Sequence, residues 1–593
     1  KDQLPPVITI YDGACGSGGM LTESQNFIAD PDGAIQHGDA RIILYGKEVN
    51  SETYAICKSD MMIKENDPAN IKFGSTLATD EFAGKRFDFM LENPPYGKSY
   101  SADQKHILDG KDILDERFLV PLKDFWGEES LEKATPRSSD GQLLFLMDMV
   151  SKMKPLDQSP AGSRIASVHN GSSLFTGDAG SGESNIRRYI IENDWLEAII
   201  QLPQNMFYNT GISTYVWVLS NNKASARQGK VQLIDGSELY RKLRKNLGAK
   251  NCEFAPEHIE KITHLYLGQV HQQTLPHGED GELSPPPISK VLDNQDFGFY
   301  KVTVERPLRL SAQFTPERVA TLRYVPALAE VMEWAYGEWG DEIYTQLADH
   351  KQAMEEYQEK EDISLNAKNR KALYTVKTWE QQRALMQVAE QLMESVEQEV
   401  WQDFNDFAEL VNETLKELSN FLASKLSASE KKQILNAVSW RDEAAARVIK
   451  KAHTLKGEKL AQLLEHLDTT EEHLADFGYW PGETAGQWVE YETDSELRDT
   501  ESVPLNYGQA DELERGTAQI HGYFLAEVRP HVEDAWIALD GTKIGYEINF
   551  NKYFYQHKPL RKLETVVEEI LALEQKTEGL LKRLVGFGTA ADG

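Results

Sequence analysis

Hydrophobic residues in the first 235 positions follow two alternating patterns. Short runs rich in Val, Ile, Leu and aromatic residues predict buried strands, and the segments between them, such as 141–153 and 185–193, repeat apolar residues at helical spacing. Strands that alternate with helices favour parallel βαβ units. The sequence therefore predicts an α/β fold with a doubly wound, mostly parallel sheet covered on both faces. The predicted strands are VITIY (7–11), RIILYG (41–46), FDFMLEN (87–93), RIASVHN (164–170), LEAIIQL (196–202), TYVWVLS (214–220) and VQLID (231–235).

The pattern changes after the Pro- and Gly-rich stretch 277–289, which predicts a domain boundary. From about residue 325 the chain is rich in Ala, Glu, Lys, Leu and Gln, and long amphipathic stretches such as Trp379–Leu410 and Glu413–Leu426 predict packed helices. We expect a catalytic domain over 1–276, a linker with connecting strands over 277–324, a mainly helical region over 325–500, and a C-terminal segment over 501–593.

The last segment has apolar residues in alternating steps of three and four, which is a heptad-like pattern. With only about three heptads, the pattern fits a helix docked on its own domain as well as a coiled coil that binds a partner. The positions are Leu563, Val566, Ile570, Leu573, Thr577, Leu580 and Leu584.

Composition narrows the class of protein. The 593 residues contain 63 Lys and Arg against 95 Asp and Glu, so the formal charge is −32. Such a surface repels phosphate backbones, and any DNA substrate would need another subunit for most phosphate contacts. No run approaches the roughly 18 apolar residues of a membrane span. Cys15, Cys57 and Cys252 lack paired spacing, which fits a reducing cytoplasm and predicts no metal site.

The chain lacks an initial Met, and its first strand begins within a few residues of Lys1. We therefore expect an N-terminal part to be absent.

A glycine-rich turn follows the first strand. Its residues are Asp12, Gly13, Ala14, Cys15, Gly16, Ser17, Gly18 and Gly19. Glycines allow a sharp turn and close approach of a ligand, and a following helix presents free N–H groups. The turn therefore implies a nucleotide-like cofactor, and because no Gly-Lys-Ser/Thr follows, triphosphate binding is disfavoured. Taken alone, a Gly-rich turn between a strand and a helix fits close packing equally well.

Glu48 lies after the second strand, where a carboxylate is well placed to accept both hydroxyls of a ribose. Asp39 is closer in sequence but precedes the strand, so we prefer Glu48. An isolated Glu at a strand end is also often only solvated.

The run Glu92-Asn93-Pro94-Pro95-Tyr96-Gly97 follows the third strand. The prolines end the strand and leave carbonyl groups as free acceptors. The amide oxygen of Asn93 and the carbonyl of Pro94 are then suited to grip an exocyclic amine and aim its lone pair at an electrophile, and Tyr96 is suited to stack on a flat base. Such a base must be flipped out of a duplex.

Taken together, these motifs resemble the modification subunit of type I restriction-modification systems, an S-adenosylmethionine-dependent DNA adenine-N6 methyltransferase. FGSTL (73–77), RIASVHNGSSLFTG, LPQNMFYNTGISTYVWVLS, VERPLRL (304–310) and DAWIALDGTKIGYEINFNKYFY (534–555) add to the resemblance. The resemblance implies a Rossmann-like methyltransferase sheet and methyl transfer without a metal or a covalent enzyme intermediate.

The resemblance also implies residue roles. Residues 12–19 would hold the methionine part of the cofactor, Glu48 its ribose, and residues 93–96 the target base. Phe207 would pack on the other face of the flipped adenine, although a core aromatic is an equally good interpretation. The implied partners are double-stranded DNA, a DNA specificity subunit, a second modification subunit and, in systems that restrict, a nuclease subunit, with no membrane.

Three features depart from the family pattern. Gly13 replaces the usual proline of the turn, Ser75 stands where an Asp or Asn commonly contacts the cofactor's adenine, and the upstream cofactor strip and N-terminal helical domain are missing.

Two other functions stay open: a protein glutamine-N5 methyltransferase, which faces the same weak amide nucleophile, and a catalytically silent scaffold subunit. The insertion Ser101–Asp140 fits either a substrate-side loop or a plain surface excursion.

Overall fold

The computed structural model describes residues 5–36, 38, 40–208, 210–272, 287–418, 426–508, 516–554 and 563–586. They form two compact units, one of residues 1–123, 129–298 and 545–593 and the other of 124–128 and 299–544. Most of the predicted boundary stretch 277–289 lies outside the described residues. The domain limits expected from the sequence stay predictions.

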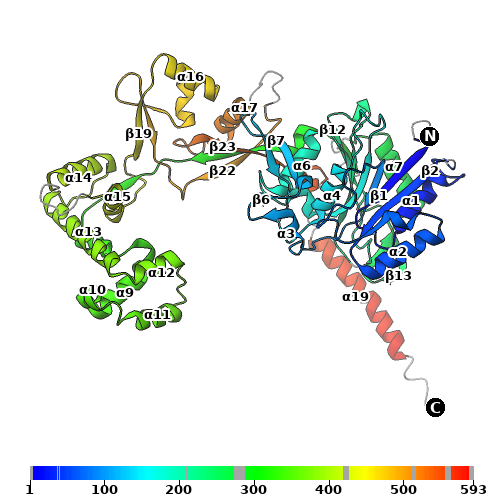
Figure 1. Ribbon diagram of the computed structural model, residues 1–593, viewed down its shortest axis with the longest axis horizontal. Helices are drawn as coiled ribbons and strands as arrows, with labels where there is room; N and C mark the ends of the chain where they lie inside the picture. The colour runs from blue at the N-terminus through cyan, green and yellow to red at the C-terminus, as the bar shows by residue number, and fades with distance from the viewer. Residues whose placement is uncertain are drawn as a thin grey trace, which may run out of the picture. The chain divides into compact units, whose positions relative to one another are not determined.

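The first unit contains a nine-stranded sheet, and all seven predicted strands are in it (Figure 1). Five neighbouring pairs are parallel, β11 is antiparallel to both β9 and β10, and the edge strand β15 is antiparallel to β12. The mostly parallel α/β fold is thereby confirmed. In order across the sheet the strands are β15 (Ser289–Asp293), β12 (Lys230–Asp235), β10 (Leu196–Gln201), β11 (Thr214–Ser220), β9 (Arg164–Asn170), β4 (Phe89–Glu92), β1 (Val7–Asp12), β2 (Arg41–Glu48) and β3 (Ile71–Phe73).

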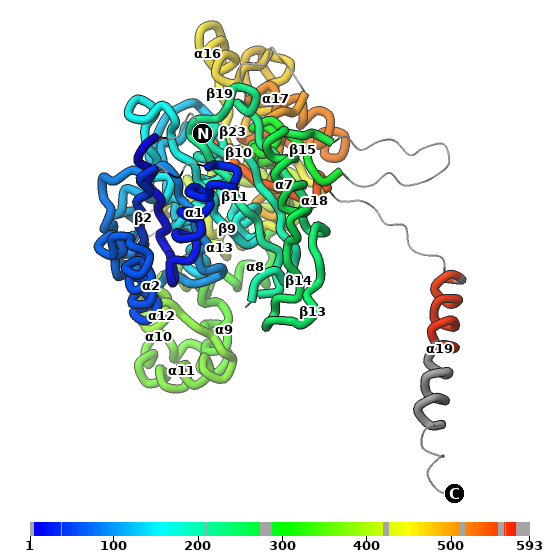
Figure 2. Tube along the Cα trace, turned by 90° about the vertical axis from the view of Figure 1, so that its right-hand side faces the viewer, coloured from blue at the N-terminus to red at the C-terminus, as the bar shows by residue number. Residues whose placement is uncertain are grey.

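Helices cover both faces of this sheet, as the alternation of side chains along β1 requires. Ile8 and Ile10 point to one face and form a core with α1 (Gly19–Ala29) and α2 (Ser51–Ile63), which lie beside β2 in both views (Figures 1 and 2). Tyr11 points to the other face, where its hydroxyl donates to Asp148 of α4 (Gln142–Ser151) at 2.8 Å. The two helices predicted between strands are α4 and α6 (Gly182–Glu192).

The first unit is discontinuous in sequence. The buried guanidinium of Arg187 in α6 donates to the carbonyl oxygen of Tyr546 at 2.6 Å. The ring of Phe550, in α18 (Phe550–Phe554), lies 5.2 Å from the ring of Tyr215. A stretch more than 250 residues beyond β15 therefore completes the packing of this unit.

After strands β16 (Gly298–Glu305) and β17 (Leu310–Ala312), the second unit is helical from Pro316 to Ala437, with two differences from the predicted pattern. The stretch Trp379–Leu410 is divided between α13 (Val376–Ser395) and α14 (Phe404–Leu418), because the backbone of Trp401 pairs with Ala312 between them. Residues 413–418 of the predicted stretch Glu413–Leu426 continue α14, and residues 419–425 lie outside the described chain.

Short strands follow the helices of the second unit, in a region that the sequence predicted as mainly helical. They pair as small antiparallel sheets with only two or three members each. The strands are β18 (Ser439–Arg441), β19 (Ile449–Thr454), β20 (Trp480–Pro481), β21 (Gln487–Tyr491) and β22 (Asp499–Pro504).

The predicted terminal helix is α19 (Leu563–Gly586). Of its heptad-like positions, Leu563 and Ile570 are 75% and 57% exposed and Val566 is half-buried. The side chains of Thr577, Leu580 and Leu584 lie outside the described residues. Among the helices described, none is both long and apolar enough to cross a membrane.

Candidate active site

The glycine-rich turn connects β1 to α1 and needs glycine for conformational reasons. Gly16 and Gly18 have φ values of +55° and +83°, in the left-handed region that side chains with a Cβ disfavour. A Cβ added to Gly18 would lie 2.8 Å from the sulfur of Cys57 and 2.9 Å from the Cε of Met61 in α2. Gly18 therefore allows both the turn and the close packing of α1 on α2.

Glu48 is held against this turn. Its carboxylate accepts the N–H of Gly16 at 2.9 Å and the N–H of Asn50 at 2.6 Å, and the N–H of Cys15 donates to the carbonyl of Lys47 at 3.0 Å. The structure thus brings the first two predicted site groups together at the carboxyl ends of β1 and β2. Asp39, the alternative to Glu48, lies outside the described residues.

Asp12 is the last residue of β1 and is only 2% exposed. Burial raises the pKa of its carboxyl group to about 7, an effect opposed by the hydrogen bond from the Ala14 N–H and increased by the nearby Glu48 carboxylate. This carboxyl group is therefore poised to gain or lose a proton near neutral pH, and a cationic ligand would favour the ionised form.

The FGSTL segment lies beside the same turn. The N–H of Gly74 donates to the carbonyl of Glu48 at 3.0 Å, and the hydroxyl of Thr76 donates to the carbonyl of Gly13. Ser75, the predicted cofactor contact, lies between them and is half-buried. Ser75 is consequently next to the turn, and its contact with a ligand stays a prediction.

The ENPPY run begins where β4 ends, next to β1 in the sheet. Tyr11 is in register with Met90, so Glu92 and Asn93 extend past the carboxyl end of β1 beside the glycine-rich turn. Asn93 and Pro95 are exposed and Pro94 is buried. The hydroxyl of Tyr96 donates to the amide oxygen of Asn93.

Two aromatic rings, those of Tyr96 and Phe207, pack edge to face beside Asn93. The rings of Tyr96 and Phe207 have centroids 6.4 Å apart and an interplanar angle of 68°. Burial raises the pKa of the Tyr96 phenol, so this hydroxyl keeps its proton and acts as a donor. Phe207 comes from the loop between β10 and β11 and is only half-buried, which distinguishes it from a core aromatic.

The sequence analysis did not identify Glu92 as a buried residue next to the glycine-rich turn. Its side chain is fully buried, and neither carboxyl oxygen has a hydrogen-bond partner among the described residues. A Cβ added to Gly13 would lie 3.0 Å from its Oε1. Burial raises the pKa of Glu92 well above its usual range, and the charges of Asp12 and Asp148 add to this rise.

A buried charge network on the α4 side of the sheet was also missed. Asp148 accepts from Arg117 at 2.7 Å and from Lys152 at 2.6 Å, in addition to Tyr11. Arg117 further donates to the carbonyl of Thr76 at 2.9 Å. The network therefore supports both the strand and the segment that border the glycine-rich turn.

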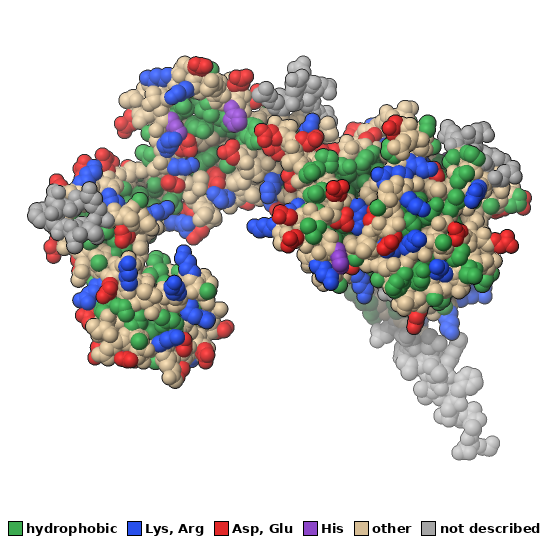
Figure 3. Space-filling model, in the orientation of Figure 1, with side chains coloured by type: hydrophobic (Ala, Val, Ile, Leu, Met, Phe, Trp, Pro, Cys, Tyr) green, Lys and Arg blue, Asp and Glu red, His purple; other side chains and the backbone are tan. Residues whose placement is uncertain are grey.

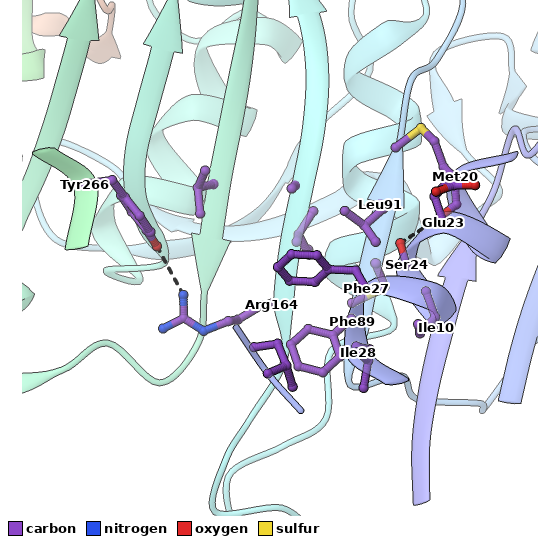
Figure 4. Close-up of a pocket in the computed structure, with 15 residues that line it drawn as sticks. Ile10, Met20, Glu23, Ser24, Phe27, Ile28, Phe89, Leu91, Arg164 and Tyr266 are labelled. Carbon is purple, nitrogen blue, oxygen red and sulfur yellow. Dashed lines mark hydrogen bonds between the residues drawn. The ribbon is translucent and has the colours of Figure 1, made fainter. Parts of the chain in front are cut away.

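A separate cavity of about 680 Å³ opens on the other face of the sheet, beside α1. Figure 4 shows Phe27 and Ile28 of α1 close to Phe89 of β4, with Arg164 and Tyr266 hydrogen-bonded at one end. The lining is mainly apolar, and none of the predicted catalytic or cofactor residues contributes to it. The candidate active site is therefore the edge of the sheet and not this cavity.

Most of the first unit matches a known protein family. Residues 5–284 match the family described as N-6 DNA methylase. The MpnII methylase subunit of a type I restriction enzyme from Mycoplasma pneumoniae is 27% identical over 43% of this chain and 42% of its own length. The MjaVII methylase subunit from Methanocaldococcus jannaschii is 28% identical over 43% and 40%. The chain thus spans less than half the length of these curated relatives.

Two solved structures are also similar to part of this chain. The methyltransferase subunit of a type I restriction-modification system from Streptococcus thermophilus has 24% identity and a TM-score of 0.36, covering 49% of this chain and 51% of its own. The EcoKI M protein has 19% identity and a TM-score of 0.32, covering 48% and 59%.

Proposed function

We propose that this chain, whose residues 5–284 match the N-6 DNA methylase family, methylates the N6 amine of adenine in DNA as the modification subunit of a type I restriction-modification complex. The observation that carries the proposal is the convergence of Asn93, Tyr96 and Phe207 beside a glycine-rich turn that Glu48 binds. The proposed base site and the proposed cofactor site would then share one edge of one sheet.

The residues at the turn fit S-adenosylmethionine as the cofactor. An added Cβ on Gly16 or Gly19 would meet no atom within 4 Å, so the turn is open on that side. Asp12 offers a carboxyl group for a cationic amine, and Glu48 offers carboxylate oxygens for ribose hydroxyls. When bound, this cofactor supplies an electrophilic methyl group on a sulfonium sulfur.

The chain's own residues would prepare the nucleophile. The amide oxygen of Asn93 and the carbonyl of Pro94 each accept one N–H bond from the adenine amine, which draws the nitrogen lone pair out of the ring. Tyr96 and Phe207 hold the flipped base by its faces. S-adenosylmethionine held at the glycine-rich turn would supply the methyl group to this nitrogen, and the amine held by Asn93 and Pro94 would lose a proton to solvent.

The negative net charge of the chain indicates that it needs partners to bind DNA. Figure 3 shows Lys and Arg side chains interspersed with Asp and Glu over the visible face, and the net charge is −32. Because phosphate neutralisation dominates DNA affinity, a DNA specificity subunit and a second copy of this chain would provide the clamp around the duplex. A nuclease subunit would join where the system also restricts DNA in the cytoplasm.

The function is tested with the assembled complex, labelled S-adenosylmethionine, unmethylated DNA and a release-factor-like protein with a glutamine acceptor. We expect the label in DNA as N6-methyladenine. Label in the protein instead would favour the glutamine methyltransferase, and cofactor binding without transfer to either would favour the silent scaffold.

The terminal helix is the segment that we expect to dock on the specificity subunit. Exposed Leu563 and Ile570 lie one heptad apart, which suits packing against a partner's helices. Deleting 562–593 should abolish co-purification with that subunit while cofactor binding stays normal. Unchanged complex assembly on a sizing column would refute this assignment.

Cofactor affinity should rise with pH around neutrality. The pKa of Asp12 is about 7 in the free protein, so below pH 7 a cationic ligand must first displace a proton, and affinity should fall up to about tenfold per pH unit. Above pH 8 the affinity should level off. Calorimetry between pH 5.5 and 8.5 measures this slope together with proton release.

Asp12→Asn supplies the control for this pH dependence, because it removes the titrating group, and it should flatten the profile. In the free protein the raised pKa has the opposite consequence for folding: the contribution of Asp12 to the free energy of unfolding decreases as pH rises from about 4 to about 7. A wild-type affinity that does not change across this range would contradict the role of Asp12.

A further inference from the structure

Three potential metal ligands meet in the second unit, outside the candidate active site. His473 and Asp476 belong to the 3₁₀ helix η8 (Glu471–Phe477), and His521 belongs to α17 (Gly516–Tyr523). One oxygen of Asp476, Oδ2, lies 3.1 Å from Nδ1 of His473 and 2.9 Å from Nε2 of His521. One ligand atom from each of the three residues lies within 4.8 Å of the others.

The surrounding packing holds these side chains in place. Asp476 is 5% exposed, and its second oxygen, Oδ1, is paired with Arg529, so Oδ2 faces the two imidazoles. The ring of His521 packs 5.1 Å from Phe477 and 4.9 Å from His473. Leu474, Phe477, Ile520 and Phe524 belong to the adjoining hydrophobic core.

The separations suit a small transition-metal ion. In a tetrahedral site with bonds of about 2.0–2.1 Å, neighbouring ligand atoms are about 3.3 Å apart. The observed nitrogen–oxygen distances of 2.9 and 3.1 Å are only slightly shorter, so an ion could enter with small side-chain movements.

The groups around these three potential ligands also fit a metal site. Nε2 of His473, the nitrogen that would not bind the ion, lies 3.6 Å from a carboxylate oxygen of Glu472, and such a carboxylate typically orients a metal-bound imidazole. The His473 side chain is 38% exposed, which leaves room for water as a fourth ligand. Arg529 would balance the charge on the oxygen that faces away from the ion.

We propose that His473, Asp476 and His521 bind one zinc-like divalent transition-metal ion that joins η8 to α17. Two imidazoles and one carboxylate are a common ligand set for such ions. The sequence alone predicts no metal site, because Asp476 and His521 are 45 residues apart and no spacing motif links them. The ion has a structural role in the second unit and is independent of methyl transfer.

The test uses the full chain after removal of metals with a chelator. Titration with Co²⁺ should give one tight equivalent with the strong visible absorption of a tetrahedral ion, and Zn²⁺ should displace it and raise the melting temperature. Mg²⁺ and Ca²⁺ should do neither. His473→Ala and His521→Gln should each weaken this equivalent at least about 100-fold.

His531→Ala is the matched control, because His531 is an exposed histidine of the same unit outside the cluster, and it should bind like wild type. His521→Gln keeps a hydrogen-bond donor for Asp476, so its metal-free melting temperature checks that the fold survives. The absence of a tight equivalent in wild type, or equal binding by all the variants, would overturn the proposal.

Discussion

Asn93→Ala is expected to lower the rate of methyl transfer by about 10²–10³-fold while the chain folds and binds cofactor normally. In the proposed mechanism the amide oxygen of Asn93 accepts a hydrogen bond that strengthens as the amine becomes tetrahedral, and loss of one such group costs rate in this range. Because the Asn93 side chain is exposed, its truncation creates no core cavity. Single-turnover methylation of DNA at saturating cofactor measures the effect.

Two further variants separate the role of Asn93 from that of its neighbours. Tyr96→Phe removes the hydroxyl that donates to Asn93 but keeps the ring, so methylation should stay within about tenfold of wild type. Tyr96→Ala also removes the stacking surface and should weaken base binding by about 1–3 kcal/mol. Wild-type methylation by Asn93→Ala would rule out the catalytic assignment.

The second large effect concerns the glycine-rich turn. Gly18→Ala should lower the free energy of unfolding by about 2–5 kcal/mol, because a left-handed residue with a Cβ costs about 1–2 kcal/mol and overpacking adds about 1–3 kcal/mol. The new methyl group would press on Cys57 and Met61. Urea unfolding followed by circular dichroism measures the change.

Neighbouring glycines provide matched controls. Gly16 also has a positive φ, but open space surrounds the position of an added Cβ. Gly16→Ala should therefore lower the free energy of unfolding by only about 1–2 kcal/mol. Gly19→Ala has neither problem and should leave stability unchanged within about 1 kcal/mol, while its methyl group enters the open side of the turn and weakens cofactor binding. Equal stability of the Gly18 and Gly19 variants would contradict the packing argument.

The sequence predicted the parts of the fold that depend on residues close to one another along the chain. The seven strands were predictable because β-rich runs ended at turns, and the proximity of Asp12, Glu48 and Asn93 followed from the shared carboxyl edge of parallel strands. Phe207 could be assigned only as either a base contact or a core residue, and its position opposite Tyr96 came from the structure.

Features that depend on distant partners were not predictable. Tyr11 and Asp148 are 137 residues apart, and no local pattern identifies their hydrogen bond or the buried network around it. Glu92 resembled any strand-end carboxylate until its burial beside Gly13 was seen. The short strands after Ala437 have too few residues to show a clear alternation, so their region was predicted as helical.

Because the first unit is discontinuous in sequence, it can complete its packing only late in translation. Arg187 is buried early in the unit, yet the carbonyl that it binds belongs to Tyr546, and Tyr215 likewise contacts Phe550. At about 5–20 residues per second, the ribosome needs tens of seconds to synthesise the intervening chain. Until then the guanidinium of Arg187 in the nascent first unit lacks the carbonyl of Tyr546, so the last folding step of this unit must follow synthesis of the whole second unit.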